Sequence, residues 1–184
     1  MIVVDIEVTE KIDDRYLKSF VLSNLKLKNI WILCSHKKSI SGNLYDQNIT
    51  KIIEIDSVIK FWQVMNNFLS PSKLFYKEKD ITSLSFFKKG ILPMWEDPKN
   101  KTGAEIQVKY LDTDDVDNNW LLALIASIGE VIDDSICGVR IVNSLKFFRL
   151  EVWFSCKKRR NVIEQSLKKI LNQASNNYTY KEHE

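Results

Sequence analysis

The sequence is poor in glycine, and its few glycines do not form a nucleotide-binding loop. Its 184 residues include only five, Gly42, Gly90, Gly103, Gly129 and Gly138. Their spacing matches neither the G-x-G-x-x-G pattern of dinucleotide-binding loops nor the G-x-x-x-x-G-K-[ST] pattern of P-loops. Nucleotide hydrolysis by a P-loop mechanism is therefore excluded.

Metal-binding and disulfide-forming residues are also scarce. There are three cysteines and two histidines, and they are widely spaced: Cys34, Cys137, Cys156, His36 and His183. No C-x-x-C or H-x-x-x-H pair occurs, so the sequence predicts no zinc site and no cofactor. An odd, small number of cysteines also disfavours a disulfide scaffold and indicates a reducing compartment.

Long apolar runs and a large net charge are absent as well. The longest apolar stretch, residues 120–128, is far shorter than the roughly 18–20 residues of a membrane span. Asp5 and Glu7 interrupt the apolar N-terminus, which excludes a secretory signal. Lysine and arginine number 27 against 24 acidic residues, a net charge of +3 that is too small for a highly basic tail binder. We expect a soluble, cytoplasmic protein with no membrane contact.

Length and composition indicate one folded domain. A chain of 184 residues fits the usual size of a single domain, and 45% hydrophobic residues supply a substantial core. We expect a single domain over residues 1–184, with a loosely ordered segment at 1–24 and the core at 25–184.

Three segments have the apolar periodicity of helices. They run over about residues 57–69, 117–131 and 159–172. Asp56 or Ser57 is a suitable cap for the first, which Pro71 is expected to end, and Asp117 is a suitable cap for the second.

Several other segments alternate between apolar and polar residues, as strands do. In one of them Arg149, Glu151 and Trp153 share a face, opposite Leu150 and Val152. Few strand–helix–strand units fit the order of segments. The sequence therefore predicts an α+β fold, with a mainly antiparallel sheet and helices on one side.

Five tryptophans are present, and one of them is poorly placed for a core. Trp31 and Trp120 lie in apolar periodic segments and are expected to be buried. Trp95 instead lies within residues 89–103, where glycines and prolines at both ends indicate a loop. A loop that displays an aromatic ring beside a carboxylate, here Glu96, is a candidate ligand platform.

The residues of this loop resemble the signature of the eukaryotic translation initiation factor 4E family, whose members bind the 7-methylguanosine cap of messenger RNA. The matching residues are Pro93-Met94-Trp95-Glu96-Asp97, Lys99-Asn100-Lys101 and Gly103. Other matches follow the family order: Asp56-Ser57-Val58, Phe61-Trp62, Trp120-Leu121, Ile128-Gly129-Glu130, Asp133-Asp134, Cys137-Gly138 and Trp153. The resemblance runs from about Leu27 to His183. It implies a strongly curved, mainly antiparallel sheet of about eight strands, backed by three helices on the convex side, with the cap on the concave side.

Six residues receive a role in cap binding from this resemblance: Tyr45, Trp95, Glu96, Trp153, Lys146 and Arg149. Methylated guanine is a cation, and a sandwich between Trp95 and a second aromatic ring would add cation–π attraction to stacking. Alignment without a gap places Tyr45 at the second position, with Asn48 matching a family asparagine. An alignment with a gap places Ile40 there, and an aliphatic side chain offers no such face.

The resemblance also implies how the base is read. The carboxylate of Glu96 would accept hydrogen bonds from N1–H and the N2 amine, a donor pair that only guanine presents on this edge. Trp153 would contact the N7 methyl group. Strand alternation places Arg149 on the same face as Trp153, so a cation for the phosphates lies beside the base contact.

Lys146 and Arg149 match the family's basic positions for the triphosphate. Two departures weaken this end of the site. Ser144 stands where the family usually has arginine, and Glu105 adds negative charge after the loop. One missing charge-assisted bond costs about 1.5–3 kcal/mol, so weaker phosphate binding is expected.

A partner site is expected on the helical side. The resemblance assigns it to Val58, Trp62, Leu121 and Ile125, which match positions that dock a Tyr-x-x-x-x-Leu-hydrophobic helix of a 4G-like scaffold or a 4E-binding repressor. The apolar arc of the second helix is wider than one buried face requires, which independently favours a partner. Burial under the N-terminal segment is the other interpretation. Leu122 and Leu25-Lys26 depart from the family pattern, so partner choice is expected to differ.

These residues predict a monomeric, non-enzymatic cap-binding protein that recruits a scaffold factor to capped mRNA or represses translation by occupying the cap. No nucleophile–base pair or carboxylate cluster indicates catalysis. The alternative is a protein-interaction module or translational repressor with weak or lost cap binding, which Tyr45, Ser144 and Glu105 motivate. A general single-strand RNA binder is less consistent with a net charge of +3.

Overall fold

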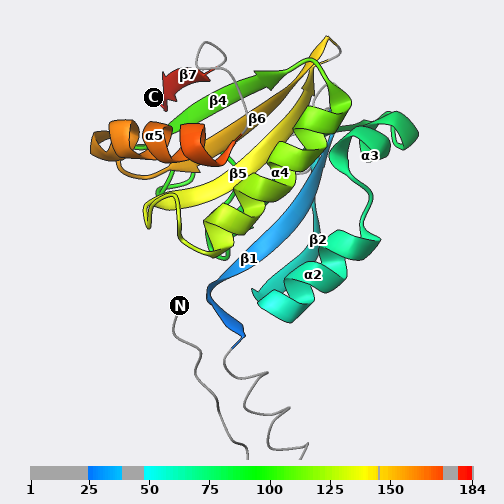
Figure 1. Ribbon diagram of the computed structural model, residues 1–184, viewed down its shortest axis with the longest axis horizontal. Coiled ribbons are helices and arrows are strands. Elements are labelled where there is room, and N and C mark those ends of the chain that lie inside the picture. Colours follow the sequence, from blue (N-terminus) through cyan, green and yellow to red (C-terminus); the bar gives the residue numbers. More distant parts are fainter. Residues whose placement is uncertain (1–24, 39–47, 145, 172–177, 184) are drawn as a thin grey trace, which may run out of the picture.

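The computed structural model describes residues 25–38, 48–144, 146–171 and 178–183, and these form a curved antiparallel sheet covered on one face by helices (Figure 1). The seven strands of the described ranges are β1 (Lys26–Lys37), β2 (Ile49–Ser57), β3 (Ile81–Lys88), β4 (Ala104–Tyr110), β5 (Ile136–Ser144), β6 (Phe147–Phe154) and β7 (Tyr178–Glu182). They lie in the order β2-β1-β3-β5-β6-β4-β7. The predicted α+β architecture is confirmed, with seven described strands where about eight were expected. The segment 1–24 lies outside the described residues.

Within the described ranges, four α-helices cover the convex face, one more than the sequence indicated (Figure 1). They are α2 (Val58–Asn67), α3 (Pro71–Lys77), α4 (Thr113–Ile128) and α5 (Arg160–Ile170), and a 3-10 turn, Lys157–Arg159, precedes α5. Within the described part of the chain, no helix is long and apolar enough to cross a membrane.

Helix α2 begins where its capping residue predicted. The Ser57 hydroxyl accepts a hydrogen bond from the Lys60 N–H, and Phe68 is the C-terminal cap. Pro71 then starts α3 rather than only ending α2. A proline at the first position of a helix loses no hydrogen bond, because that N–H has no partner within the helix. The periodicity missed α3 because seven residues are too few for a clear apolar stripe.

The sequence predicted that helix α4 begins near Asp117, and this prediction was wrong because the helix begins at Thr113. Asp112 caps the helix and accepts hydrogen bonds from the N–H groups of Asp114 at 2.7 Å and Asp115 at 3.5 Å. Asp117 lies inside the helix, where its carboxylate accepts hydrogen bonds from the Ser72 N–H at 2.9 Å and the Ser72 hydroxyl at 2.6 Å. It therefore joins α4 to α3 instead of capping α4.

Alternation along the strands divides their side chains between two faces of the sheet. Apolar side chains face the helices and form the core with α4; they include Trp31, Leu33, Leu84, Phe86, Ile106, Val108, Val139, Ile141, Leu150, Val152, Trp120 and Leu124. Trp31 stacks on Phe86 with ring centroids 5.0 Å apart, and Trp31 and Trp120 are both buried as expected. The neighbouring positions on the same strands point to the concave face, where the candidate site lies.

Candidate functional site

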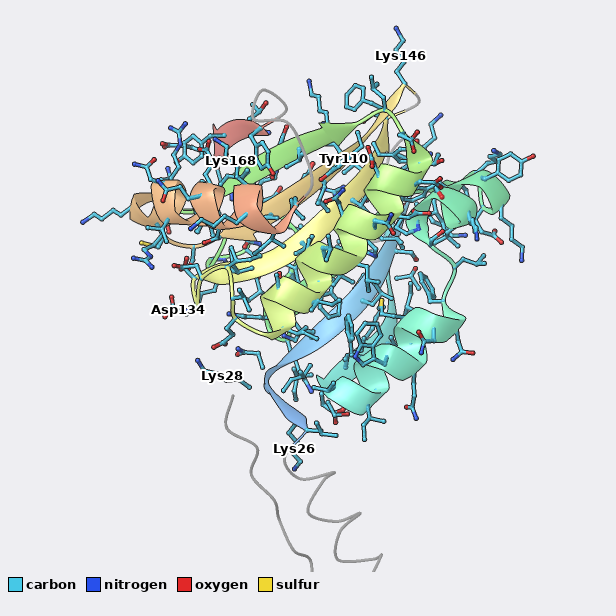
Figure 2. The ribbon with its side chains drawn as sticks, viewed as in Figure 1. Lys26, Lys28, Tyr110, Asp134, Lys146 and Lys168 are labelled. Atoms are coloured by element: carbon cyan, nitrogen blue, oxygen red, sulfur yellow. The ribbon has the colours of Figure 1, made fainter. Side chains whose placement is uncertain are left out.

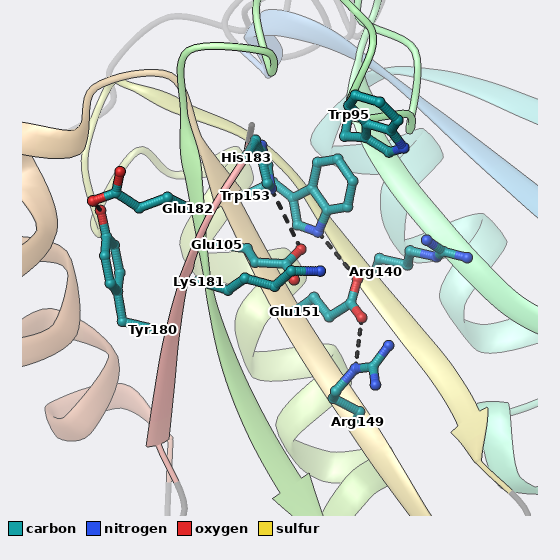
Figure 3. A pocket seen from close by; sticks show the side chains of 10 residues that line it. All are labelled: Trp95, Glu105, Arg140, Arg149, Glu151, Trp153, Tyr180, Lys181, Glu182 and His183. Carbon is teal, nitrogen blue, oxygen red and sulfur yellow. Dashed lines mark hydrogen bonds and ion pairs between the residues drawn. The ribbon is translucent and has the colours of Figure 1, made fainter.

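Charged side chains from four neighbouring strands meet on the concave face of the sheet (Figure 3). Strand pairing sets Glu105 of β4 opposite Trp153 of β6 on one side and opposite Lys181 of β7 on the other. It also sets Arg140 of β5 directly opposite Glu151 of β6. Directly opposed side chains lie close enough to interact, so the register brings these groups together.

A pocket of about 770 Å³ opens among these side chains. It is lined by Trp95, Glu105, Arg140, Arg149, Glu151, Trp153, Tyr180, Lys181, Glu182 and His183 (Figure 3). A slot of about 290 Å³ is lined by Pro93, Met94, Trp95, Glu96, Arg140 and Trp153. The two cavities share Trp95, Arg140 and Trp153, so one elongated ligand can occupy both.

The loop that carries Trp95 and Glu96 is fixed by a buried carboxylate. Asp97 accepts a hydrogen bond from the Leu92 N–H at 2.9 Å through one oxygen and from the Lys99 N–H at 2.8 Å through the other. Because these bonds close the loop on both sides of its tip, Trp95 stays 51% exposed beside the exposed Glu96.

A buried amide fixes the same loop from beneath. Asn100, only 1% exposed, donates hydrogen bonds to the carbonyl oxygens of Leu92 at 2.7 Å and Met94 at 2.8 Å. The loop then ends at Gly103, where a Cβ would lie 2.2 Å from the Phe154 carbonyl oxygen. Only glycine allows the chain to enter β4 this close to β6.

Trp153 forms an inner wall of the pocket and is 4% exposed. Phe87 meets its ring edge-on with centroids 5.5 Å apart, and the His183 ring lies 4.4 Å away at a tilt of 52°. The indole Nε1–H donates to a carboxylate oxygen of Glu151 at 3.1 Å. Since its polar atom is bonded within the protein, Trp153 offers a ligand the apolar surface of its ring.

Glu151 joins Trp153 to a cation. Its second oxygen accepts a hydrogen bond from Arg149 Nε at 2.7 Å, and the carboxylate is only 2% exposed. An ion pair whose carboxylate is buried and accepts charge-assisted hydrogen bonds holds its members in fixed positions. Arg149 and Trp153 are therefore positioned by one side chain.

Glu105 is a second buried carboxylate in the pocket, 3% exposed. Gln107 donates to one of its oxygens at 2.5 Å, and His183 Nε2 lies 3.5 Å from the other. Burial raises the pKa of Glu105, but the contacts with His183 and Gln107 and the charge of Lys181 outweigh burial, so the net pKa lies below its ordinary value. Glu105 remains a carboxylate at neutral pH.

Arg140 connects the pocket to a polar cluster on β1 and β3. Its guanidinium donates hydrogen bonds to the Ser83 hydroxyl at 3.1 and 3.3 Å. Nearby, His36 Nε2 and the Ser85 hydroxyl are 2.7 Å apart, and both side chains are buried. Burial and the charge of Arg140 lower the pKa of His36 to about 3.

Four of the six residues predicted for the cap line these cavities: Trp95, Glu96, Trp153 and Arg149. Lys146 does not line them; it is exposed in the turn between β5 and β6 and points away from the sheet (Figure 2). Tyr45 and its alternative Ile40 fall outside the described residues.

Sequence reasoning missed the roles of Arg140, Glu151 and His183. Arg140 is the single charged residue of β5, and Glu151 stands between Arg149 and Trp153 on one strand face. A lone charge within an apolar strand and an acid between two predicted site residues could have indicated that Arg140 and Glu151 face the site. His183 gave none, because the residue that its ring nitrogen contacts, Asn100, is 83 positions away in the chain.

The four predicted partner-binding residues lie on the convex side, away from the pocket. Val58 and Trp62 belong to α2, and Leu121 and Ile125 to α4. Trp62 is 40% exposed and the other three are half-buried. Leu121 also lines an apolar groove of about 210 Å³ between the end of α2 and the start of α4.

The described residues contain no group of three or more histidine, cysteine, aspartate or glutamate side chains that could hold a metal ion. Glu105, Glu151 and His183 instead bond to protein partners.

Comparison with known proteins gives one consistent result at the level of sequence. The family model described as eukaryotic initiation factor 4E matches residues 26–184. Translation initiation factor 4E-1 of Schizosaccharomyces pombe is 34% identical over 151 residues, which cover 78% of this chain and 66% of that protein. Human initiation factor 4E is 33% identical over 143 residues, covering 74% and 64%. The chain thus spans just under two thirds of the length of these relatives.

Solved structures of initiation factor 4E proteins are also similar to this chain. The complex of C. elegans eIF4E-3 with the 4E-binding protein Mextli and a cap analogue superposes with a TM-score of 0.74 at 28% identity, covering 86% of this chain and 92% of that one. The complex of Ascaris suum eIF4E-3 with an m7G cap gives a TM-score of 0.75 at 26% identity, covering 87% and 92%.

Proposed function

The chain belongs to the eukaryotic initiation factor 4E family, and on this basis we propose that it binds the 7-methylguanosine cap of messenger RNA on its concave face and acts in translation initiation. The observation that carries the proposal is the placement of Trp95 and Glu96 side by side at the tip of a loop fixed by Asp97 and Asn100. The slot beneath this tip reaches Trp153. An aromatic ring, an acid and a buried indole are the groups that a methylated guanine requires.

The proposed contact with the base is a sandwich of rings. Trp95, half exposed at the loop tip, is one face of the sandwich, and Tyr45 is the other. A cationic base between two aromatic rings gains up to ~2 kcal/mol of cation–π attraction once water is excluded. The smaller ring of Tyr45 supports a weaker cap affinity than a second tryptophan would give.

Glu96 is proposed to read the guanine edge. Its carboxylate accepts hydrogen bonds from N1–H and the N2 amine, and the charge on the methylated base strengthens both. Trp153 is proposed to contact the N7 methyl group, which is supported by the bond from its Nε1–H to Glu151 that leaves only apolar ring surface for a ligand. A protein that binds in this way has no need of a catalytic group.

The phosphates are proposed to extend from the slot toward Arg149, which Glu151 holds at 2.7 Å. Lys146, exposed in the turn beyond the pocket, is proposed to meet the distal phosphates or the following nucleotide. Ser144 carries no charge, so this end of the site depends on fewer cations than the resemblance would require.

The convex face is proposed to bind a helical partner, with the protein as a monomer. Val58, Trp62, Leu121 and Ile125 form the proposed surface for a Tyr-x-x-x-x-Leu-hydrophobic motif. The partial exposure of Trp62 and the apolar groove beside Leu121 support this surface. C. elegans eIF4E-3 is seen in complex with a 4E-binding protein, which makes a 4E-binding repressor or a 4G-like scaffold the proposed class of partner.

Titration of the protein with 7-methyl-GTP and with unmethylated GTP, followed by tryptophan fluorescence, tests the cap proposal. Binding is expected to be much tighter for the methylated nucleotide, because GTP lacks the cation that the sandwich selects. Trp95→Ala is expected to abolish this preference. Trp62→Ala is the matched control, since it removes another exposed tryptophan from the opposite face. Equal affinity for the two nucleotides would overturn the proposal.

A further inference from the structure

The pocket contains two buried carboxylates where a triphosphate would be expected to meet only cations. Glu105 and Glu151 are 3% and 2% exposed, and both line the cavity (Figure 3). Negative side chains at a phosphate site oppose the ligand, because like charges at close range repel and burial reduces screening by water. Their partners therefore decide how much positive charge is left for a ligand.

Glu151 is set among both arginines of the pocket. Arg149 bonds to one of its oxygens at 2.7 Å, and Arg140 stands directly opposite it in the β5–β6 register. Its other oxygen is held by the Trp153 indole at 3.1 Å. These contacts keep the negative charge within the row of cations, and rotation of the carboxylate away from the pocket would break two hydrogen bonds.

Glu105 has a corresponding set of partners. Lys181 is directly opposite it in the β4–β7 register, and His183 Nε2 lies 3.5 Å from its carboxylate. The net pKa of Glu105 lies below its ordinary value, so this charge persists at neutral pH. Each buried carboxylate thus compensates one cation of the pocket, Arg149 for Glu151 and Lys181 for Glu105.

Glu182 also lines the pocket but belongs to the other side of β7. Its carboxylate binds Lys157 at 2.8 Å and accepts a hydrogen bond from the Tyr180 hydroxyl at 3.0 Å. Figure 3 shows Glu182 and Tyr180 on the opposite side of the strand from Lys181 and Glu105. The charge of Glu182 therefore points away from Glu105, Glu151 and their cationic partners.

We propose that this pocket recognises a methylated guanine nucleotide largely independently of the length of its phosphate chain, because Glu105 and Glu151 neutralise two of its three cations, Lys181 and Arg149, and the third, Arg140, is bonded to Ser83. The inference rests on the proposed cap-binding function and deepens it. A monophosphate then binds nearly as tightly as a triphosphate, because Lys146, the cation proposed for the distal phosphates, is exposed and screened by water and salt. Base stacking supplies most of the affinity.

Titrations with 7-methyl-GMP, 7-methyl-GDP and 7-methyl-GTP at one ionic strength test the proposal on the unmodified protein. The three affinities are expected to agree within about threefold, the size of effect that compensated charges produce. Raising the salt concentration is expected to change them little, because few counterions are released. A rise of about tenfold or more for each added phosphate, the value of a full charge-assisted bond, would overturn it.

Glu151→Gln tests the residue directly. The amide oxygen of glutamine can still accept the Trp153 hydrogen bond, but the negative charge is gone. Affinity for 7-methyl-GTP is expected to rise about threefold or more relative to 7-methyl-GMP, with a steeper dependence on salt. Glu164→Gln makes the same change in net charge on α5, away from the pocket, and is expected to leave the series unchanged.

The outcomes separate this inference from the function on which it rests. If no 7-methylguanine nucleotide binds, the proposed function itself is wrong. If all bind but affinity climbs with phosphate number, only the charge compensation is wrong. If the affinities for the mono-, di- and triphosphate are equal both in the unmodified protein and in a folded Glu151→Gln variant, the role of Glu151 is contradicted. Glu105→Gln provides the second variant if Glu151→Gln does not fold.

Discussion

The imidazole of His183 packs against the indole of Trp153 with ring centroids 4.4 Å apart and planes inclined by 52°. Trp153 belongs to β6 and His183 directly follows β7, with β4 between the two strands. The His183 Nδ1–H also donates to the Asn100 carbonyl at 2.8 Å. One side chain thus joins the last described strand, the loop of Trp95 and the inner wall of the pocket.

His183→Ala is expected to weaken binding of 7-methyl-GTP about two- to tenfold, because Trp153 loses an aromatic contact worth ~0.5–1.5 kcal/mol. Fluorescence titration of the variant and the unmodified protein measures the change. His183→Phe retains a ring but loses the hydrogen bond to Asn100 and the polar contact with Glu105. Its affinity is expected to lie between those of the unmodified protein and His183→Ala. Unchanged affinity in His183→Ala would show that Trp153 is held without this contact.

Gly103→Ala is expected to destabilise the fold by ~1–3 kcal/mol or more, because overpacking forces the surrounding structure to shift. Its Cβ would lie 2.2 Å from the Phe154 carbonyl oxygen and 3.0 Å from that of Asn100, and both are backbone atoms. Urea unfolding measures the loss. Gly129→Ala is the control. Its Cβ would lie 3.2 Å from the nearest atom, the Ile125 carbonyl oxygen, so a smaller loss of stability is expected. Equal losses at both positions would contradict the steric explanation.

Trp62→Ala is expected to weaken binding of a peptide carrying the Tyr-x-x-x-x-Leu motif about 30-fold, the effect of losing a tryptophan hot spot of ~2 kcal/mol. Thermal stability is expected to change little, because the side chain is already 40% exposed. Binding of 7-methyl-GTP serves as the internal control, since α2 lies on the face opposite the pocket. If the peptide binds Trp62→Ala as tightly as before, the partner site lies elsewhere.

Acidification is expected to destabilise the protein through His36. The pKa of this buried histidine is lowered from 6.5 to about 3. Below pH 6.5 the unfolded chain therefore binds a proton at His36 that the folded chain does not bind. The stability that this group contributes is present above pH 6.5 and is lost as pH falls toward 3, by ~2 kcal/mol between pH 7 and pH 5.

Unfolding free energies at pH 7 and pH 5 measure this effect in the unmodified protein and in His36→Gln. Glutamine can keep a hydrogen bond to Ser85 but does not titrate, so the decline is expected to be shallower in the variant. His183 remains in both proteins, and the difference between them therefore isolates His36. Parallel declines would contradict the buried, neutral state of His36.

Local signals in the sequence were sufficient for the elements near the site. The glycines and prolines around Trp95 predicted its loop, and period-two alternation placed Arg149 and Trp153 on one face of β6. Ser57 marked the start of α2 correctly. The start of α4 was missed because the acidic residues Asp112 and Asp117 are both suitable caps, and only packing against α3 decides between them.

The amino-acid sequence by itself determined the family, the antiparallel sheet with helices on one face, and the loop that displays Trp95 and Glu96, because each depends on a motif or a short-range periodicity. Tertiary structure alone decided that Glu105, Arg140 and His183 surround Trp153. They come from β4, from β5 and from the position directly after β7, and their meeting depends on a strand order and register that no local pattern contains. The charge balance of the pocket therefore follows from pairing between distant segments.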